Sequence, residues 1–436
     1  MELFKDLSRI WKKDNHPFLI YNNKKISFED ISKNTNTLND ISNINQIRKG
    51  ETVALIGDYD PRTIFYLIKL IDSHNIIVPL TDSTNELHEE FFDIAQVDVI
   101  LQNGVLKRRK HNKQNMMVNK LRKLNHAGLI AFSSGTSGKP KAIVHDLTLF
   151  LKKFLTPKVG YKTINFLLFD HVGGLNTMFH TLFNKGTIII PNSRSVEDVI
   201  NCCKKYNVEV LPTTPSFLRM LLLSENVPLC IPKTLKIITY GTEIMDEFTL
   251  KKLTLLLPNI DFRQTYGVSE LGVFRVRSFA RDSLFMKIGG EGVQVRVKNK
   301  ILEIKTTSPM MGYLNASNPF DKYGWYNTHD IVEQSAEYVK IVGRDSDIIN
   351  VSGLKFIASE VEKIAMNFTK IAFAKCYSRS NPITGEHCEI IVEPIKNSDF
   401  NKKDFKVFLN KYLQPHMVPR KILIKKIEIS HRFKRL

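Results

Sequence analysis

The chain has 436 residues, of which 43% are hydrophobic and 25% are charged. These are ordinary proportions for a globular protein, and the length suits two or three domains. No apolar run reaches the roughly 20 residues that cross a bilayer, and no signal-peptide core is visible, so we expect a cytoplasmic protein without a membrane span. The five cysteines form no Cys-x-x-Cys pair. This spacing argues against a disulfide framework or a zinc site and predicts buried free thiols.

The formal net charge of +19 is unevenly distributed along the chain. From Lys402 to the end, eleven lysines and arginines stand against two acidic residues. A second basic run, residues 107–113, is predicted to be a solvated loop. No basic surface interleaved with aromatic side chains can be read from the sequence, so we expect no specific binding of nucleic acid.

Strand-like and helix-like patterns alternate over most of the chain. Residues 52–58 are a short apolar run typical of a buried strand, residues 61–74 have helical periodicity, and residues 75–82 are again strand-like. The same alternation returns over residues 186–225, and together these patterns predict an α/β sheet. After about residue 285 the pattern changes to short β-like runs joined by turns. A segment of mixed α+β character follows Gly343.

A loop rich in glycine, hydroxyl groups and lysine occupies residues 133–141, between two apolar runs. Its glycines let consecutive backbone N–H groups turn toward an anion, and its hydroxyls and lysines add donors and charge. The spacing excludes a Walker-A loop. Considered alone, the loop fits either a polyphosphate cradle or a flexible surface turn. The candidate phosphate-binding residues are Ser134, Gly135, Thr136, Ser137, Gly138 and Lys141.

This loop and four later segments resemble, in order, the motifs of the adenylate-forming superfamily, which includes acyl-CoA synthetases, peptide-synthetase adenylation domains and beetle luciferase. The later segments are residues 239–243, 264–272, 323–330 and 343–362. The resemblance implies a large N-terminal α/β domain with a β-rich subdomain, hinged to a small α+β C-terminal domain. The implied boundaries are residues 1–344 for the large domain, 345–346 for the hinge and 347–436 for the small domain.

The resemblance also implies a reaction in two steps. A carboxylate attacks the α-phosphate of ATP and releases pyrophosphate, and the thiol of CoA or of an acyl carrier protein then displaces AMP from the acyl-adenylate. In this scheme Ser269 donates to the α-phosphate and Glu270 ligates Mg²⁺, a hard cation that suits one carboxylate plus phosphate oxygens. Two other classes stay open: adenylation of an amino acid or acyl transfer to an amine, and a degenerate nucleotide-binding protein.

The nucleotide site is implied residue by residue. The adenine-pocket loop contains Gly241, Thr242 and Glu243, while Tyr266 is expected to stack on adenine. Asp330 would accept from the ribose hydroxyls, and Arg344 would reach the ribose or a phosphate. Gly241 and Gly267 are expected to permit close approach of the backbone to the nucleotide and the acyl chain. His329 stands where the family usually has glycine, and we expect a negative φ there because a side chain disfavours the left-handed region.

The acid site can be aligned in two ways over residues 165–179. One alignment gives Asp170 the task of holding an amino group. The other places His171 and Gly173 in a His-x-x-Gly-like segment and fits better, which favours a simple carboxylic acid over an amino acid.

The C-terminal domain is expected to contribute Gly353 to a thiol tunnel and Lys434 to adenylation. Lys434 falls at the spacing of the family's catalytic lysine, but Glu428, Ser430 and Phe433 replace the usual Pro, Thr and Gly around it. A solvated terminal lysine is the other interpretation of that position. The basic balance after Lys402 suggests an acidic acyl carrier protein as the thiol partner.

Overall fold

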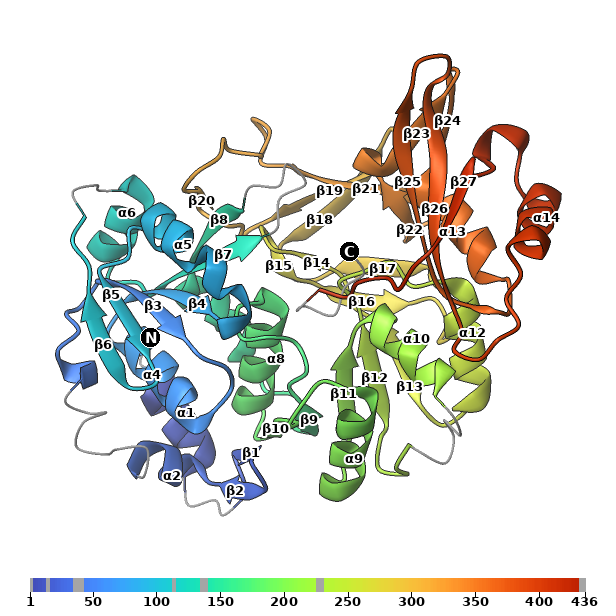
Figure 1. Cartoon of the computed structure of the whole chain (residues 1–436). Coiled ribbons are helices and arrows are strands. Elements are labelled where there is room, and N and C mark those ends of the chain that lie inside the picture. The colour runs from blue at the N-terminus through green and yellow to red at the C-terminus, as the bar shows by residue number, and fades with distance from the viewer. Residues whose placement is uncertain are drawn as a thin grey trace.

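We analysed a computed structural model of the chain, which describes residues 3–12, 16–33, 43–111, 115–133, 140–224 and 231–430. Of the residues proposed above, Ser134, Gly135, Thr136, Ser137, Gly138 and Lys434 lie outside the described residues. The described part contains two large sheets, a separate β-rich subdomain and a small C-terminal domain (Figure 1).

The first seven-stranded sheet is built from the alternation predicted near the N-terminus. Its central strands β4, β3 and β5 are parallel, and β7 joins them in parallel on β4. Asp60 caps helix α4 (Pro61–Asp72) by accepting from the backbone of Arg62 and Thr63, as a helix N-terminus requires. In sheet order the strands are β20 (Gly312–Tyr313), β8 (Lys141–Asp146), β7 (Gly128–Ser133), β4 (Ile76–Leu80), β3 (Thr52–Ile56), β5 (Val99–Gln102) and β6 (Val105–Arg108).

The second seven-stranded sheet faces the first across a shared hydrophobic core. That core takes side chains from strands of both sheets and from α4 and helix α8 (Val172–Phe183). In sheet order the strands are β13 (Asp261–Gln264), β12 (Ile237–Tyr240), β11 (Val210–Thr213), β9 (Lys162–Ile164), β10 (Thr187–Ile189), β1 (Leu19–Tyr21) and β2 (Lys24–Ile26). The other helices of this region are α1 (Leu3–Trp11), α2 (Phe28–Lys33), α5 (His88–Ala95), α6 (Met116–Leu124), α7 (Leu147–Leu151), α9 (Val196–Tyr206), α10 (Pro215–Leu223) and α12 (Glu247–Leu256), with 3-10 turns η1 (Asp82–Leu87) and η2 (Lys152–Phe154).

The change of pattern near residue 285 marks the β-rich subdomain. Its six strands pair antiparallel. In sheet order they are β16 (Arg275–Ser278), β17 (Met286–Gly289), β22 (Tyr338–Arg344), β21 (Tyr326–Ser335), β19 (Ile301–Thr306) and β18 (Val293–Lys298). A short hairpin of β14 (Gly267–Val268) and β15 (Gly272–Val273) links this subdomain to the second large sheet. The predicted fold class is therefore confirmed.

The small C-terminal domain has its own core beneath a five-stranded sheet. Turn η3 (Asp345–Asp347) leads into it from β22. Gly353 forms the two-residue turn of its first hairpin with Ser352, and both have positive φ, 88° and 52°; such a turn favours glycine. The elements are β23 (Ile348–Val351), β24 (Leu354–Ile357), α13 (Ala358–Met366), β25 (Ile371–Asn381), β26 (Gly385–Pro394), α14 (Lys402–Tyr412), η4 (Pro415–Met417) and β27 (Lys421–Ile424).

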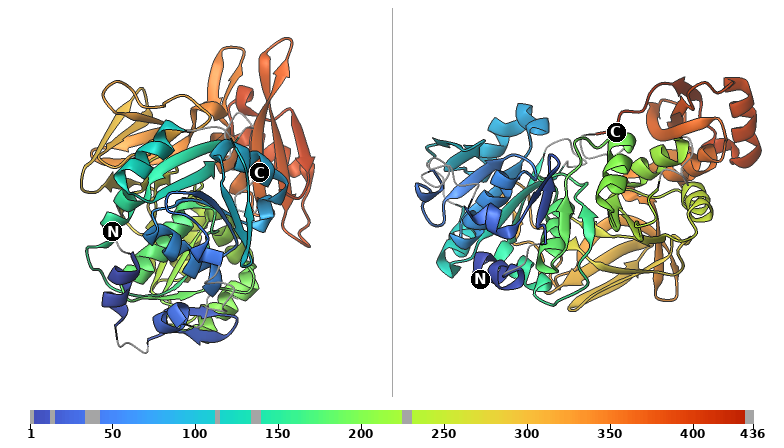
Figure 2. Two further views of the ribbon diagram at one scale, coloured as in Figure 1. Left: turned by 90° about the vertical axis from the view of Figure 1, so that its left-hand side faces the viewer. Right: turned by 90° about the horizontal axis from the view of Figure 1, so that it is seen from below.

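The small domain packs against α10 and α12 of the large domain, and Figures 1 and 2 show it at the opposite end of the molecule from β5 and β6. The guanidinium of Arg219 in α10 is buried and donates to the carbonyl oxygens of Ile371 and Ala372, each at 3.0 Å. Ile427 completes an apolar cluster with Met220. A buried guanidinium donates in fixed directions, so its bonds to two backbone carbonyls hold the small domain in one orientation relative to α10.

Three observations bear on the earlier expectations. The basic run 107–113 starts within β6, and Arg109 pairs with Glu89 and Asp93 at 2.6 and 2.7 Å, so the expectation of a purely solvated loop is wrong for this part. Cys202, Cys203, Cys376 and Cys388 are buried free thiols, as predicted; Cys230 lies outside the described residues. Within those residues, no helix has the length and apolar character to cross a membrane.

Candidate active site

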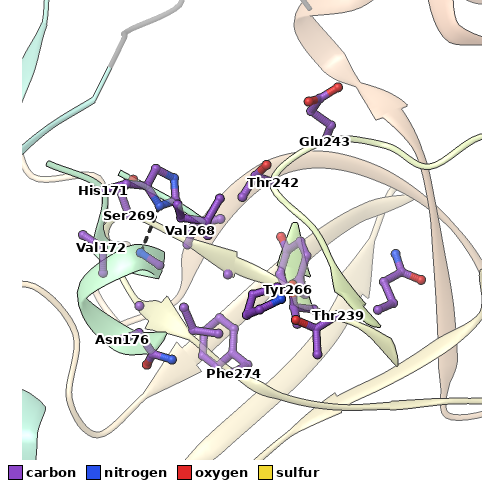
Figure 3. A pocket seen from close by; sticks show the side chains of 18 of the residues that line it. His171, Val172, Asn176, Thr239, Thr242, Glu243, Tyr266, Val268, Ser269 and Phe274 are labelled. Carbon is purple, nitrogen blue, oxygen red and sulfur yellow. Dashed lines mark hydrogen bonds between the residues drawn. The ribbon is translucent and has the colours of Figure 1, made fainter. Parts of the chain in front are cut away.

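A cavity of about 1200 Å³ opens between the second large sheet, α8, the β-rich subdomain and turn η3. Figure 3 shows Tyr266 and Phe274 on one side of it, and on another side His171, at the N-terminus of α8, and Asn176, within that helix. Segments separated by more than 200 residues meet here. Of the proposed site residues, those lining it are Lys141, His171, Gly173, Thr242, Glu243, Tyr266, Gly267, Ser269, Glu270, Asp330 and Arg344. Asp170, Gly241 and Gly353 are not among its lining residues.

Asp330 is the centre of one polar cluster in this cavity. It is 5% exposed, and it accepts from the Tyr266 hydroxyl at 2.6 Å and from Arg344 Nε at 3.0 Å. Asp330 and Arg344 are cross-strand partners on β21 and β22. Burial raises the pKa of the Asp330 carboxyl, and the positive charge of Arg344 opposes that shift. The cluster therefore holds one carboxylate rigidly at the cavity wall, where it can accept from paired hydroxyls.

Tyr266 takes part in this cluster through its hydroxyl, a role that the motif alone did not indicate. Its ring lies nearly parallel to Phe274, at an interplanar angle of 17° with the centroids 6.2 Å apart. Both residues line the cavity. The pair offers a flat aromatic wall beside the Asp330 carboxylate.

His329 has φ of 62°, so the expectation of a negative φ at this position is wrong. Its backbone N–H donates to Asn327 Oδ1 at 2.7 Å, and its Nδ1 lies 2.8 Å from Asp345 Oδ2. A side chain in the left-handed region costs about 1 kcal/mol. These two contacts offset that cost, and the second of them reaches the turn that enters the small domain.

Glu270 is the centre of a second polar cluster. It is 9% exposed and accepts from the Tyr313 hydroxyl at 2.7 Å. Burial and the neighbouring Glu270 raise the pKa of Tyr313, so its hydroxyl stays protonated and donates. Lys141 Nζ lies 5.3 Å from the centre of the Tyr313 ring. A carboxylate and an ammonium group thus face the same cavity, which suits a phosphate chain together with a divalent cation.

His145 supports this cluster from behind. It is buried on β8, and its Nε2 donates to the carbonyl oxygen of Ser269 at 2.7 Å, which fixes the backbone that carries Ser269 and Glu270. Sequence reasoning missed both His145 and Tyr313, because each is far along the chain from its partner. His145 lies 124 residues from Ser269, and Tyr313 lies 43 residues from Glu270.

The pKa of His145 predicts a pH dependence of stability. Burial lowers it from 6.5 to about 4, so the stability that the neutral ring contributes is complete above pH 6.5 and is lost as the pH falls toward 4. Between pH 7.5 and pH 5 we expect this group to cost about 2 kcal/mol of unfolding free energy. Urea unfolding at both pH values should show a smaller loss for His145→Gln, which keeps a donor but does not titrate. Equal losses in the two proteins would contradict the assignment.

The packing of the chain itself requires glycine at positions 241 and 267, and the expected approach of the nucleotide and acyl chain stays a prediction. A Cβ at Gly241 would lie 2.2 Å from Thr265 Oγ1, and one at Gly267 would lie 2.6 Å from the carbonyl oxygen of Gly272. Both glycines therefore permit close packing of the protein's own chain. Between them, the backbone of Thr242 adopts a positive φ of 73°.

The residues predicted to bind the acid lie at the N-terminus of α8. His171 caps this helix by accepting at Nδ1 from the backbone N–H of Gly173 at 3.0 Å. Asp170 is 4% exposed, so the structure places His171 at the cavity and Asp170 behind it. Glu243, on the loop predicted to form the adenine pocket, accepts from Ser216 Oγ at 2.7 Å.

Comparison with known proteins adds to this geometry. The profile described as AMP-binding enzyme matches residues 12–308. The chain belongs to the AMP-binding enzyme family. A curated relative in Narcissus pseudonarcissus, 4-coumarate-CoA ligase 2, is 26% identical over 322 residues, which cover 64% of this chain and 56% of that protein. The acyl-CoA ligase YhfT of Bacillus subtilis is 24% identical over 321 residues, covering 68% and 64%. The match therefore spans less than two thirds of either relative.

Solved structures of AMP-binding enzymes share the fold over nearly the whole chain. The o-succinylbenzoate CoA synthetase of Bacillus subtilis, in complex with its acyl-adenylate intermediate, has a TM-score of 0.80 at 16% identity, covering 100% of this chain and 96% of that one. The amide bond synthetase McbA from Marinactinospora thermotolerans has a TM-score of 0.76 at 15% identity, covering 99% and 97%. At such identities the likeness establishes the fold, and the reaction has to be argued from the site.

Proposed function

We propose that this AMP-binding enzyme is an ATP-dependent acid ligase that forms an acyl-adenylate and then a thioester. The observation that carries the proposal is one cavity that joins the Asp330–Arg344–Tyr266 cluster to the Glu270–Lys141 cluster. The first cluster suits a ribose beside an aromatic wall, and the second suits a phosphate chain. In the first step a carboxylate oxygen of the acid bonds to the α-phosphorus of ATP, and the bond from that phosphorus to the pyrophosphate oxygen breaks.

The residues act by positioning and charge, since this reaction needs no covalent enzyme group. Asp330 accepts from the ribose hydroxyls, Ser269 donates to the α-phosphate, and Lys141 neutralises phosphate charge. Glu270 would hold Mg²⁺ together with phosphate oxygens, a donor set that this cation prefers. When bound, the cation supplies charge neutralisation on the phosphates.

ATP–pyrophosphate exchange tests the first step directly. Purified full-length protein, Mg²⁺, ATP and labelled pyrophosphate are combined with fatty, aryl and amino acids in turn. The proposal expects exchange that depends on both Mg²⁺ and one class of carboxylic acid. An acid that stabilises the protein on binding yet supports no exchange would overturn it.

We further propose that residues 1–344 and 347–436 move as units about Asp345 and Ser346. Both hinge residues line the cavity, while Gly353 lies in the β23–β24 turn outside it. A thiol tunnel that includes Gly353 therefore requires rotation of the small domain. Such a rotation would separate Arg219 from its two carbonyl acceptors.

The acceptor thiol is proposed to belong to an acidic carrier protein rather than to free CoA. On the small domain, Lys402, Lys403, Lys406, Lys425 and Lys426 are exposed and form no ion pair with any described residue. Clustered positive charge speeds encounter with an acidic partner, and salt screens that attraction.

Replacing these five lysines by glutamates should slow acyl transfer to a phosphopantetheinylated carrier by about tenfold or more at low salt. Transfer to CoA and to a simple amine, measured on the same proteins, provides the comparison. Efficient transfer to CoA at a rate that the charge reversal does not change, together with no transfer to the carrier protein, would exclude a carrier protein as the acceptor. Transfer to the amine alone would favour the amide-forming alternative.

A further inference from the structure

The end of the cavity farthest along α8 is polar. Thr177, Thr181 and Asn184 line it, but their side chains are already hydrogen-bonded. Each donates, at 2.7 to 3.0 Å, to the backbone carbonyl four residues earlier on α8. Asn176 and His180 also line the cavity, one turn apart on the same helix. Neither side chain makes a hydrogen bond or ion pair with the part of the chain that the structure describes.

Three cationic side chains gather around this end of α8. Lys153 Nζ lies over the rings of Phe150 and Phe154, at 4.1 and 5.0 Å from their centres. The Phe154 ring in turn packs against Phe179, the neighbour of His180 on α8. Lys153 is thereby held next to the helix that carries His180.

Lys158 follows Lys153 on the same stretch of chain, and Arg275 begins β16. The side chains of Lys153, Lys158 and Arg275 are exposed and lie at the rim of the cavity rather than among its lining residues. The backbone N–H of Lys158 donates to Asn184 Oδ1 at the C-terminus of α8, and the next residue, Val159, lines the cavity. Arg275 directly follows Phe274 of the aromatic wall. Two stretches of chain, residues 153–158 and the start of β16, therefore bring positive charge to the rim of this end of the cavity.

This charge has no counter-ion within the described residues: no carboxylate there pairs with Lys153, Lys158 or Arg275. Lys153 is exposed, but partial desolvation beside its aromatic neighbours and then the charge of Lys158 lower its pKa to about 8. Burial, Lys158 and Lys153 lower the pKa of His180 to about 4. The groups repel one another, and an anion placed among them would relieve that repulsion.

We propose that this end of the cavity binds a second anionic group of the acid, so that the substrate is a dicarboxylic acid or an acid with another distal anion. The inference rests on the proposed function, because it names the substrate class of the same site. His180 and Asn176 then donate to the distal anion while Lys153, Lys158 and Arg275 supply the charge. A long saturated chain would leave these polar groups unpaired, which costs affinity.

The test compares α,ω-dicarboxylic acids of four to eight carbons with monocarboxylic acids of the same length and with ω-phosphonocarboxylic acids. Acid binding is measured by calorimetry with a non-hydrolysable ATP analogue, and KM and kcat by pyrophosphate exchange. One dicarboxylate length should bind at least about tenfold more tightly than its monocarboxylic partner, as expected for one good charged contact. A phosphonate that binds better still would assign the subsite to a phosphorylated acid.

Two variants and one matched control locate the effect. Lys158→Gln and His180→Gln should each raise KM for the dicarboxylate about tenfold with kcat within twofold, and should leave monocarboxylic acids unchanged. Lys152→Gln removes the neighbouring exposed lysine, whose charge is not among the causes that lower the pKa of His180, and should change nothing. Exchange that favours monocarboxylic acids and ignores these variants overturns the inference and leaves the proposed function standing. If no acid supports exchange, the proposed function fails, but calorimetry still tests the subsite. Binding of a dicarboxylate that Lys158→Gln weakens would support the subsite. No binding of any dicarboxylate would overturn it.

Discussion

Glu270→Gln is expected to lower the rate of ATP–pyrophosphate exchange by about 10³-fold, because it removes the one carboxylate proposed to hold Mg²⁺ against the phosphate chain. Glu270 faces the cavity and accepts from Tyr313. Glutamine keeps the shape and an acceptor for that hydroxyl, so the loss should report charge rather than packing. The measurement is exchange at saturating acid over a series of Mg²⁺ concentrations.

Tyr313→Phe is the matched control for this variant. It removes the hydrogen bond to Glu270 and keeps the carboxylate, so we expect a loss of no more than about tenfold, near the value of one hydrogen bond to a charged group. Exchange by Glu270→Gln at more than a tenth of the normal rate would show that the carboxylate does not hold the cation.

Lys434→Ala is expected to slow adenylate formation by about 10²–10³-fold, which corresponds to losing one preorganised donor at a phosphorus that gains charge. Lys434 lies outside the described residues. The chain before it contacts the large domain, since Ile427 shares an apolar cluster with Met220 of α10. The N–H of Ile427 also donates to Glu393 Oε2 of the small domain at 2.8 Å. Single-turnover formation of acyl-adenylate measures the first step.

Attack of the thiol on preformed acyl-adenylate, measured with the same Lys434→Ala protein, separates a catalytic role from a general one. This second step should keep its normal rate. Lys426→Ala, an exposed lysine shortly before the terminus, should affect neither step of adenylate chemistry with CoA as acceptor. If Lys434→Ala slows both half-reactions equally, the match of spacing at the terminus is accidental.

Local patterns predicted much of the fold. The apolar run at 52–58, the helical period at 61–74 and the second apolar run at 75–82 became β3, α4 and β4, because buried strands and an amphipathic helix are determined by short-range periodicity. The order of the motifs likewise led to residues that line one cavity, from Lys141 to Arg344.

Features that depend on distant segments could not be predicted in this way. The left-handed conformation of His329 depends on contacts with Asn327 and Asp345, which no local rule supplies. The support of Glu270 by Tyr313 needs β20 to lie beside the β14–β15 hairpin. Glycine is required at position 241 because Thr265, the residue directly after β13, leaves no room for a side chain there. Each of these is a property of tertiary packing.

The contact of Arg219 with the small domain has a consequence for how the two cores share stability. Its guanidinium is 4% exposed and is solvated by carbonyl groups of β25 in place of water. Detaching the small domain would remove these acceptors, leave water to hydrate the guanidinium, and expose the apolar cluster around Met220 and Ile427. We therefore expect the stabilities of the two parts to be coupled and a fragment ending before Asp345 to be less stable than the full chain. The half-reactions are for this reason best dissected with the full chain.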